Sequence, residues 1–271
     1  MKYSATDAIA DFLKEEGLRD TPQVARPGIA AAGSVAKAIL NSPLLRDTFK
    51  AHGIQASKFS DYVDCTKLVQ DSTWALALVL APCKPEAYEL TSKHLAPMAA
   101  RTKVVDTILR LDDTLYGINT NVYAIQAAVK QLVGNKRPQT ALIAGTSATA
   151  RSVLVGLHEL YPEAHIDVIG RTAGKTHAVL KVCNTAKAVQ NIESGKYDLV
   201  VNATSVGVKN YDDRLDYSIE DTFEPGVRFF DVIIGRTYLQ QTALDRGCSV
   251  ISGAAMQYAT NVFRAGLLGG K

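Results

Sequence analysis

The chain has 271 residues, a formal net charge of +3, and 47% hydrophobic and 21% charged residues. This length accommodates one large or two modest domains, and the composition is ordinary for a soluble globular protein. The charge is too small to indicate nucleic-acid binding, and no cluster interleaves Lys and Arg with aromatic residues. We therefore expect a small-molecule substrate as partner, no nucleic acid, and a monomer or homodimer.

The four cysteines lie far apart and lack the spacing of metal ligands or of a disulfide framework. We expect buried thiols, no metal and no disulfide. The N-terminal segment is amphipathic and acidic, unlike a signal peptide, and the longest apolar run, TWALALVLAPC, is too short to span a bilayer. These features predict a cytoplasmic protein without a membrane segment.

Apolar spacing predicts a helix over 5–17, followed by a Gly/Ala-rich segment, GIAAAGSVAKAIL. A second helix is expected from Pro43 to Gly53, with Ser42 or Asn41 as its cap. WALALVLAPC predicts a buried strand ended by Pro82, and EAYELTSKHLAPMAA a single helix over 86–100.

KVVDTILRLDDTLYGIN predicts a hairpin that turns at Asp112 and Asp113. A helix should start directly after it, at Asn119-Thr120-Asn121. These three residues are of the capping type, and we expect them both to cap the helix and to line a pocket.

After a boundary at VGNKRPQT, short apolar strands alternate with helical patterns. Strands are expected at 140–145, 165–170, 197–204 and 227–234, helices after the first two, and a closing helix in SGAAMQYATNVFRAGLL. Such alternation predicts a parallel, doubly wound sheet.

IAGTSATARSV follows a strand and opens a helix, which is the position of a dinucleotide-binding turn. Gly145 supplies the tight turn, and helix N–H groups face a pyrophosphate in such turns. Ser147 and Ala148 stand where further glycines are expected, so a generic strand–helix turn is nearly as consistent with the motif.

The next strand ends in VIGRTAGKT, where an acidic residue selects NAD and a basic one accommodates a 2′-phosphate. Arg171, Thr172 and Lys175 supply two cations and a hydroxyl, with no carboxylate nearby. We expect NADP as cofactor, with NAD as the second choice. The alternative is a solvated basic loop.

Seven segments occur in one order: SPLLRDTFKAHGI, LAPCK, VVDTILRLDDTLYGINTN, IAGTSATARSV, GRT, NATSVGV and SGAAM. From about residue 30 onward this order resembles the shikimate/quinate dehydrogenase family, and NATSVGV and YGINTN are the most specific pieces. The resemblance implies an α/β fold with an N-terminal α/β substrate domain (1–121 and 241–271). It also implies a Rossmann-type NAD(P)-binding domain (122–240) and a C-terminal helix that returns to the first domain.

The resemblance implies hydride transfer between nicotinamide and a ring ketone or alcohol, and it places the catalytic lysine at Lys84. The family's catalytic aspartate position carries over to Asn121, and its pocket asparagine aligns with Asp106, so an Asn and an Asp have exchanged places. Either Asp106 retains a carboxylate that pairs with Lys84, or it only caps a turn and the acid–base pair is lost.

Several substrate positions also depart from the family. Leu40 and Ser42 stand where the family has two carboxylate-binding serines, Leu80 replaces a threonine, and Thr260 aligns with a glutamine. Burying leucine where a hydroxyl met a carboxylate removes partners for an anionic ligand, so a substrate other than shikimate is expected. The substrate-binding candidates are Ser42, Thr107, Gln257 and Thr260. The cofactor-binding candidates are Gly145, Thr146, Ser147, Ala148, Arg171, Thr172, Lys175, Asn202, Thr204, Ser205, Gly207 and Gly253.

The sequence thus predicts a shikimate dehydrogenase-like, NADP-dependent alcohol dehydrogenase or ketone reductase. One alternative is a non-catalytic descendant that binds a small molecule or a partner and regulates. Another is an authentic shikimate dehydrogenase of a divergent lineage.

Overall fold

The computed structural model describes residues 5–19, 27–207 and 217–270. Contacts divide the chain into two units, Met1–Asn121 with Tyr258–Lys271, and Val122–Gln257. The second unit thus extends to residue 257, whereas the sequence analysis ended it at 240. The reason is that strand β11 (Ser249–Ser252) pairs in parallel with β10 (Arg228–Asp231) and completes the second sheet.

The first unit is built on a mixed sheet with the strand order β2-β1-β3-β4-β5. β1 pairs in parallel with β2 and β3, whereas β3–β4 and β4–β5 are antiparallel. β1 and β3 are buried along their whole length, as their apolar sequences GIAAA and LALV require. The strands are β1 (Gly28–Ala32), β2 (Lys58–Tyr62), β3 (Leu76–Val79), β4 (Thr107–Leu111) and β5 (Thr114–Ile118).

The first two expected helices are confirmed, and the antiparallel pairing of β4 with β5 confirms the expected hairpin. The third expected helix is instead divided into two helices. They are α1 (Ala5–Glu15), α2 (Ala36–Leu40), α3 (Pro43–Ala51), α4 (Cys65–Gln70), α5 (Lys84–Leu90) and α6 (Pro97–Thr102). The single helix predicted over 86–100 is wrong. Leu95 forms a parallel bridge with Gly117, and Ala96 donates its N–H to the Gly117 carbonyl at 2.9 Å. The chain therefore runs beside β5 before Pro97 starts α6, a position where its missing N–H is tolerated.

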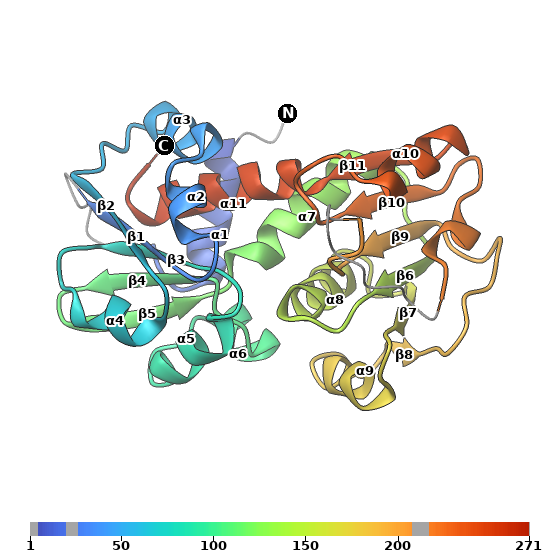
Figure 1. The fold of residues 1–271 in the computed structure, drawn as a ribbon, viewed down its shortest axis with the longest axis horizontal. Coiled ribbons are helices and arrows are strands. Elements are labelled where there is room, and N and C mark those ends of the chain that lie inside the picture. Colours follow the sequence, from blue (N-terminus) through green and yellow to red (C-terminus); the bar gives the residue numbers. More distant parts are fainter. Residues whose placement is uncertain (1–4, 20–26, 208–216, 271) are drawn as a thin grey trace. The chain divides into compact units, whose positions relative to one another are not determined.

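The second unit is a parallel sheet with the strand order β8-β7-β6-β9-β10-β11 (Figure 1). This is the Rossmann order, and it confirms the predicted doubly wound sheet; the order reverses between β6 and β9. The remaining strands are β6 (Thr140–Ala144), β7 (His165–Ile169), β8 (Lys187–Ala188) and β9 (Leu199–Asn202). Its own helices are α8 (Ala148–Leu160), α9 (Ala173–Leu180) and α10 (Tyr238–Asp245), with a 3₁₀ turn at Ile219–Thr222. Two helices belong to both units: α7 (Thr120–Val133) begins in the first unit, and α11 (Gly253–Leu267) begins in the second and continues in the first from Tyr258.

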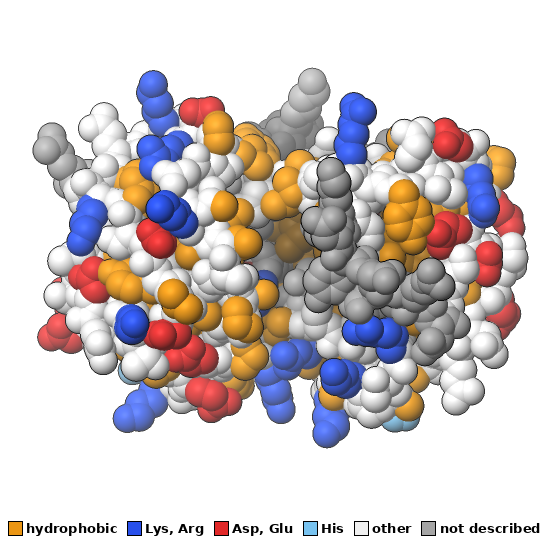
Figure 2. Space-filling model, in the orientation of Figure 1, with side chains coloured by type: hydrophobic (Ala, Val, Ile, Leu, Met, Phe, Trp, Pro, Cys, Tyr) orange, Lys and Arg blue, Asp and Glu red, His pale blue; other side chains and the backbone are white. Residues whose placement is uncertain are grey.

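The distribution of charged side chains on the surface agrees with the composition, in which 30 Lys and Arg nearly balance 27 Asp and Glu. On the face shown in Figure 2, basic and acidic side chains are interspersed, with hydrophobic side chains scattered among them. Among the helices in the described ranges, none has both the length and the apolar character that a membrane crossing requires.

Candidate active site

A buried carboxylate in the first unit, Asp106, holds the start of α7 and is only 1% exposed. Its Oδ1 accepts the Thr120 N–H at 3.2 Å and the Thr120 hydroxyl at 2.7 Å. Its Oδ2 accepts the Asn121 N–H at 2.8 Å. Two helix N–H groups that lack intrahelical acceptors are thereby satisfied, and a negative charge lies at the positive end of the helix dipole.

The three residues expected at the start of α7 all form hydrogen bonds with residues from other parts of the first unit. Asn119 directly precedes the helix, and its side-chain amide donates to the Thr102 hydroxyl at 2.8 Å. Thr120 and Asn121 are the donors that Asp106 satisfies. Asp106 lies 14 positions before Thr120, at the entry to β4, so local spacing did not reveal its contribution to the helix start.

Arg264, on α11, is the ionic partner of Asp106 and is 3% exposed. Its Nη2 lies 3.7 Å from Asp106 Oδ1 and donates to the Asp106 backbone carbonyl at 3.1 Å. Its Nε donates to the Thr107 hydroxyl at 3.0 Å. Burial lowers the pKa of Arg264 and the Asp106 carboxylate partly offsets this, which leaves the pKa at about 10. The guanidinium therefore stays charged at neutral pH.

Sequence reasoning missed Arg264 because an arginine on a closing helix usually faces solvent. A usable signal was nonetheless present in the sequence, because Arg264 is the one charged residue of the segment TNVFRAGLL. In the structure, residues 260–267 of α11 are all buried. A helix that is buried all round has no solvent face, so a charge within it needs a partner.

Lys84, the predicted catalytic lysine, is the first residue of α5 and is half-buried. Within the described ranges, no residue forms a hydrogen bond or an ion pair with its side chain. Burial lowers the pKa of Lys84, the Asp106 carboxylate raises it, and the Arg264 charge lowers it. Lys84 is thus close enough to feel both charges, yet its nitrogen remains available to a ligand.

The other first-unit candidates differ in how far they join this cluster. The Thr107 hydroxyl donates to Asp106 Oδ1 at 2.7 Å and accepts from Arg264, so it supports the carboxylate rather than offering a free group. Ser42 is the half-buried N-cap residue of α3 and makes no side-chain cap hydrogen bond. Thr260 is buried on α11, and Gln257, which falls in the second unit, is half-buried.

In the second unit, Gly145 forms the turn after β6, where the strand order reverses. Its φ is +127°, and a Cβ would lie 2.7 Å from the Ala203 carbonyl oxygen, so only glycine fits. Ser147 caps α8: its hydroxyl accepts the Ala150 N–H at 3.3 Å and donates to the Ala203 carbonyl. The Gly145 turn thus leads directly into the first turn of a 13-residue helix, whose backbone N–H groups can bind a pyrophosphate. Thr146 and Ala148, in the same turn, are half-buried.

The NATSVGV turn after β9 is built by its own side chains. Asn202 is fully buried; it donates to Asp231 Oδ1 at 3.1 Å and accepts the Thr204 hydroxyl at 2.6 Å. Asp231, which the sequence analysis did not single out, also accepts from Thr237 and Gln240. Burial raises the pKa of Asp231, and these hydrogen bonds lower it. Asn202 and Thr204 therefore shape the turn.

The remaining cofactor candidates are divided between close-packed and exposed positions. A Cβ on Gly253 would lie 2.0 Å from the Val232 carbonyl oxygen, and one on Gly207 would lie 2.9 Å from Thr237. Ser205 is half-buried after β9. The three residues after β7, which are Arg171, Thr172 and Lys175, are exposed.

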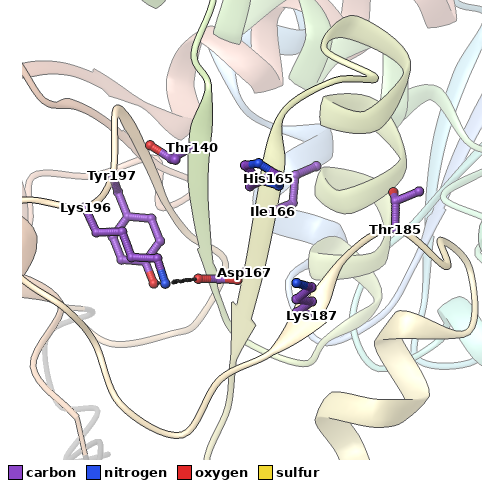
Figure 3. Close-up of a pocket in the computed structure, with 8 residues that line it drawn as sticks. All are labelled: Thr140, His165, Ile166, Asp167, Thr185, Lys187, Lys196 and Tyr197. Atoms are coloured by element: carbon purple, nitrogen blue, oxygen red, sulfur yellow. Dashed lines mark hydrogen bonds and ion pairs between the residues drawn. The ribbon is translucent and has the colours of Figure 1, made fainter.

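A cavity of about 290 Å³ in the second unit is separate from these candidates. Figure 3 shows Lys196 and Tyr197 directed towards Asp167, with hydrogen-bonding distances of 3.0 and 2.9 Å. Thr140 and His165 are the first residues of β6 and β7, so the cavity reaches the amino ends of the strands. Ligands of open α/β sheets bind at the carboxyl ends, so we do not assign the dinucleotide to this cavity.

Comparisons with known proteins agree with this geometry, although no protein-family model matches the chain. A shikimate dehydrogenase (NADP(+)) of Bordetella avium is 25% identical over 190 residues, which is 66% of this chain and 65% of that protein. A shikimate dehydrogenase (NADP(+)) of Pasteurella multocida is 30% identical over 136 residues, 48% of this chain and 49% of that protein. The chain therefore matches less than two thirds of the length of either relative.

Solved structures share the fold over a longer span. Shikimate dehydrogenase of Aquifex aeolicus has a TM-score of 0.77 at 20% identity, covering 88% of this chain and 91% of that one. A 5-ketofructose reductase of Gluconobacter has a TM-score of 0.71 at 19% identity, covering 87% and 90%. The chain thus shares the α/β fold of these structures. In sequence and in fold, the chain is thus similar to proteins named shikimate dehydrogenase.

We predict that Asp106→Asn lowers the free energy of unfolding of the first unit by about 3 kcal/mol. The Thr120 and Asn121 N–H groups use different carboxylate oxygens, so an amide leaves one of them facing an NH₂ group, and Arg264 loses its counter-charge. Urea unfolding followed by the fluorescence of Trp74 measures this, because Trp74 is the chain's one tryptophan and is buried in the first unit.

The matched control is Asp112→Asn, the same chemical change at an exposed turn residue with φ of +51°, a conformation that asparagine tolerates. Its effect should stay within about 0.5 kcal/mol. Equal effects of the two substitutions would show that Asp106 does not anchor α7.

Proposed function

We propose that the chain is a shikimate dehydrogenase-like, NADP-dependent oxidoreductase that interconverts a ring alcohol and a ketone. The names of the curated relatives support the activity class and the cofactor. The observation that carries the proposal is Lys84: its nitrogen has no partner in the described ranges and lies within the electrostatic reach of Asp106 and Arg264.

The second unit supplies a turn that fits the dinucleotide. Gly145 permits close backbone approach, the start of α8 offers N–H donors to the pyrophosphate, and Arg171 and Lys175 are exposed cations suited to a 2′-phosphate. Bound nicotinamide supplies a two-electron hydride acceptor or donor. In oxidation, the carbinol carbon gives up its hydride and the hydroxyl oxygen gives up its proton, and in reduction both steps reverse.

Lys84 is the residue that we assign to the reacting oxygen. Its nitrogen donates a hydrogen bond to that oxygen as negative charge develops there, and it relays the proton between substrate and solvent. In this proposal Asp106 does not act as the general acid or base. Its Oδ1 accepts from the Thr107 and Thr120 hydroxyls and its Oδ2 accepts from the Asn121 N–H, so both oxygens hold the start of α7 and its surroundings in place. We therefore propose that Asp106 positions the site and that Lys84 transfers the proton.

The substrate that we propose is less polar than shikimate. Leu40 is buried and Leu80 half-buried at positions that carry hydroxyl groups in the family. A buried leucine offers nothing to a carboxylate, and an unpaired buried carboxylate is strongly disfavoured. One solved structure with a similar fold is named a 5-ketofructose reductase. Its name supports the proposal that proteins of this fold act on carbonyl compounds other than the shikimate pair.

A second candidate function is a non-catalytic binding protein. It is favoured by Asn121, whose amide cannot take a proton, and by Asp106, whose two oxygens both accept hydrogen bonds from the start of α7. In that case the dinucleotide would bind saturably without turnover on any substrate. The third candidate, authentic shikimate dehydrogenase, predicts turnover of shikimate itself that depends on Lys84.

The activity is tested by screening cyclic alcohols with NADP⁺ and cyclic ketones with NADPH, shikimate included. We expect turnover of at least one substrate, and Lys84→Met should lower kcat/KM by roughly 10²–10⁴, the usual contribution of a proton-transfer group. Lys93→Met, at an exposed lysine of the same unit, is the control and should leave the rate unchanged. Full activity in Lys84→Met would refute the assignment of Lys84.

The cofactor choice is tested by titrating NADPH and NADH against the purified protein. NADPH should bind more tightly, and Arg171→Ala should weaken NADPH binding by roughly 10- to 100-fold with little effect on NADH, because a charged hydrogen bond contributes about 1.5–3 kcal/mol. Arg137→Ala replaces an exposed arginine that precedes β6, at the opposite sheet edge from Gly145, and should change neither affinity. Equal loss for both dinucleotides would contradict a 2′-phosphate contact by Arg171.

A further inference from the structure

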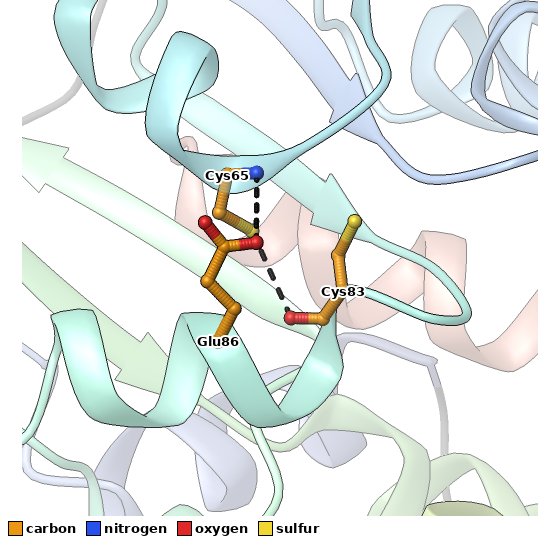
Figure 4. Close-up of side chains that lie close together, drawn as sticks. All are labelled: Cys65, Cys83 and Glu86. Carbon is orange, nitrogen blue, oxygen red and sulfur yellow. Dashed lines mark hydrogen bonds between the residues drawn. The ribbon is translucent and has the colours of Figure 1, made fainter.

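The first unit brings together two thiols and a carboxylate that are far apart in the sequence. Cys65 is the first residue of α4, Cys83 immediately precedes α5, and Glu86 lies in the first turn of α5 (Figure 4). Their ligand atoms all lie within 4.8 Å of one another. Both cysteines are buried, and Glu86 is half-buried. The sequence analysis expected no metal, because 18 residues separate the two cysteines and no ligand motif links them.

The three groups are held in place by hydrogen bonds that leave lone pairs available. Glu86 Oε2 accepts the Cys65 N–H at 3.2 Å, and Oε1 accepts the Thr66 hydroxyl at 2.9 Å. The Cys65 thiol is 3.8 Å from the Cys83 carbonyl, and the Cys83 thiol is 3.4 Å from the Val63 carbonyl. Each carboxylate oxygen has two acceptor positions, so Glu86 can keep these contacts and still bind a cation. Such contacts are the kind that orient metal ligands in known sites.

We propose that Cys65, Cys83 and Glu86 form a binding site for a thiophilic divalent cation of the zinc type, with water in the fourth position. Zinc binds thiolate sulfur at about 2.3 Å and carboxylate oxygen at about 2.0–2.2 Å, so tetrahedral ligands lie roughly 3.5–3.8 Å apart. The observed upper limit of 4.8 Å requires only a small contraction on binding. On binding, each thiol releases its proton to solvent and two metal–sulfur bonds and one metal–oxygen bond form, with no change of oxidation state.

This site goes beyond the proposed oxidoreductase function and uses none of the groups assigned to hydride transfer. Its failure would leave the assignment of Lys84 intact, and the reverse also holds. Since Cys83 immediately precedes Lys84, an ion bound there would restrain the backbone at the start of α5.

The other two cysteines provide a matched internal control. Cys183 and Cys248 are also buried but lie in the second unit. Cys183 is 3.2 Å from the Thr185 hydroxyl, and the Cys248 thiol is 3.4 Å from the Glu224 carbonyl. Among the described residues, the Cys65 cluster is the one group of three potential metal ligands.

The test is a titration of the fully reduced protein with Co²⁺, whose thiolate complexes absorb by sulfur-to-metal charge transfer. We expect one Co²⁺ per chain in the wild type and in Cys183→Ser/Cys248→Ser, displaced in both by Zn²⁺. Cys65→Ser and Cys83→Ser should each lower the affinity at least a hundredfold and remove the absorption. Glu86→Gln, which keeps both thiols, should weaken binding about tenfold.

Circular dichroism and the shift of Tm with Zn²⁺ keep the test decisive if a cysteine variant folds poorly. Zinc at 100 times its Kd should stabilise the wild type by about 2.7 kcal/mol, while a folded Cys65→Ser should not respond. The proposal is overturned by the absence of saturable Co²⁺ uptake in Cys183→Ser/Cys248→Ser, or by charge-transfer absorption that survives in Cys65→Ser. A protein that takes up no metal when it is reduced, but forms a Cys65–Cys83 disulfide when it is oxidised, would also overturn the proposal.

Discussion

The candidate site depends on one buried carboxylate that faces a helix start and a buried guanidinium. Asp106 joins β4, α7 and α11, because its oxygens accept from Thr120 and Asn121 while Arg264 supplies the opposite charge. A buried charge is tolerable only when it is paired and fully hydrogen-bonded, so these segments are fixed together. The second unit repeats the device: Asp231 is fully buried, and its donors Asn202 and Thr237 fix the turns after β9 and β10.

Much of the fold was predictable because its signals are local. The apolar runs of β3, β6, β7 and β9, the Asp112-Asp113 turn and Pro43 at the start of α3 each depend on neighbours in the sequence. β2 was missed because its residues are half-exposed and show no apolar alternation. The break between α5 and α6 was missed because it is caused by pairing of Leu95 with Gly117, 22 residues away, which local helix propensity does not contain.

The candidate site was predictable only where a motif carries it. Lys84 and the Gly145 turn follow from their places after apolar strands and from the family resemblance, and their assignment to catalysis and cofactor binding remains a proposal. The pairing of Asp106 with Arg264 was missed because the two residues are 158 positions apart and an arginine on a closing helix usually faces solvent. The meeting of Cys65, Cys83 and Glu86 likewise arises from the sheet topology, which brings the starts of α4 and α5 together. Sequence motifs for metal sites recognise ligands that lie close together on one turn or hairpin, whereas Cys65 and Cys83 lie at the starts of two different helices.

The most direct test of this account is a double-mutant cycle between Asp106 and Arg264, read from urea unfolding by the fluorescence of Trp74. Asp106→Asn and Arg264→Gln each leave a buried partner without its counter-charge, whereas the double variant leaves none. We predict that the double variant loses less stability than the sum of the single variants, by about 1–3 kcal/mol. Losses that add to within about 0.5 kcal/mol would show that the two groups are not coupled. The anchoring role of Asp106 would then have to be abandoned.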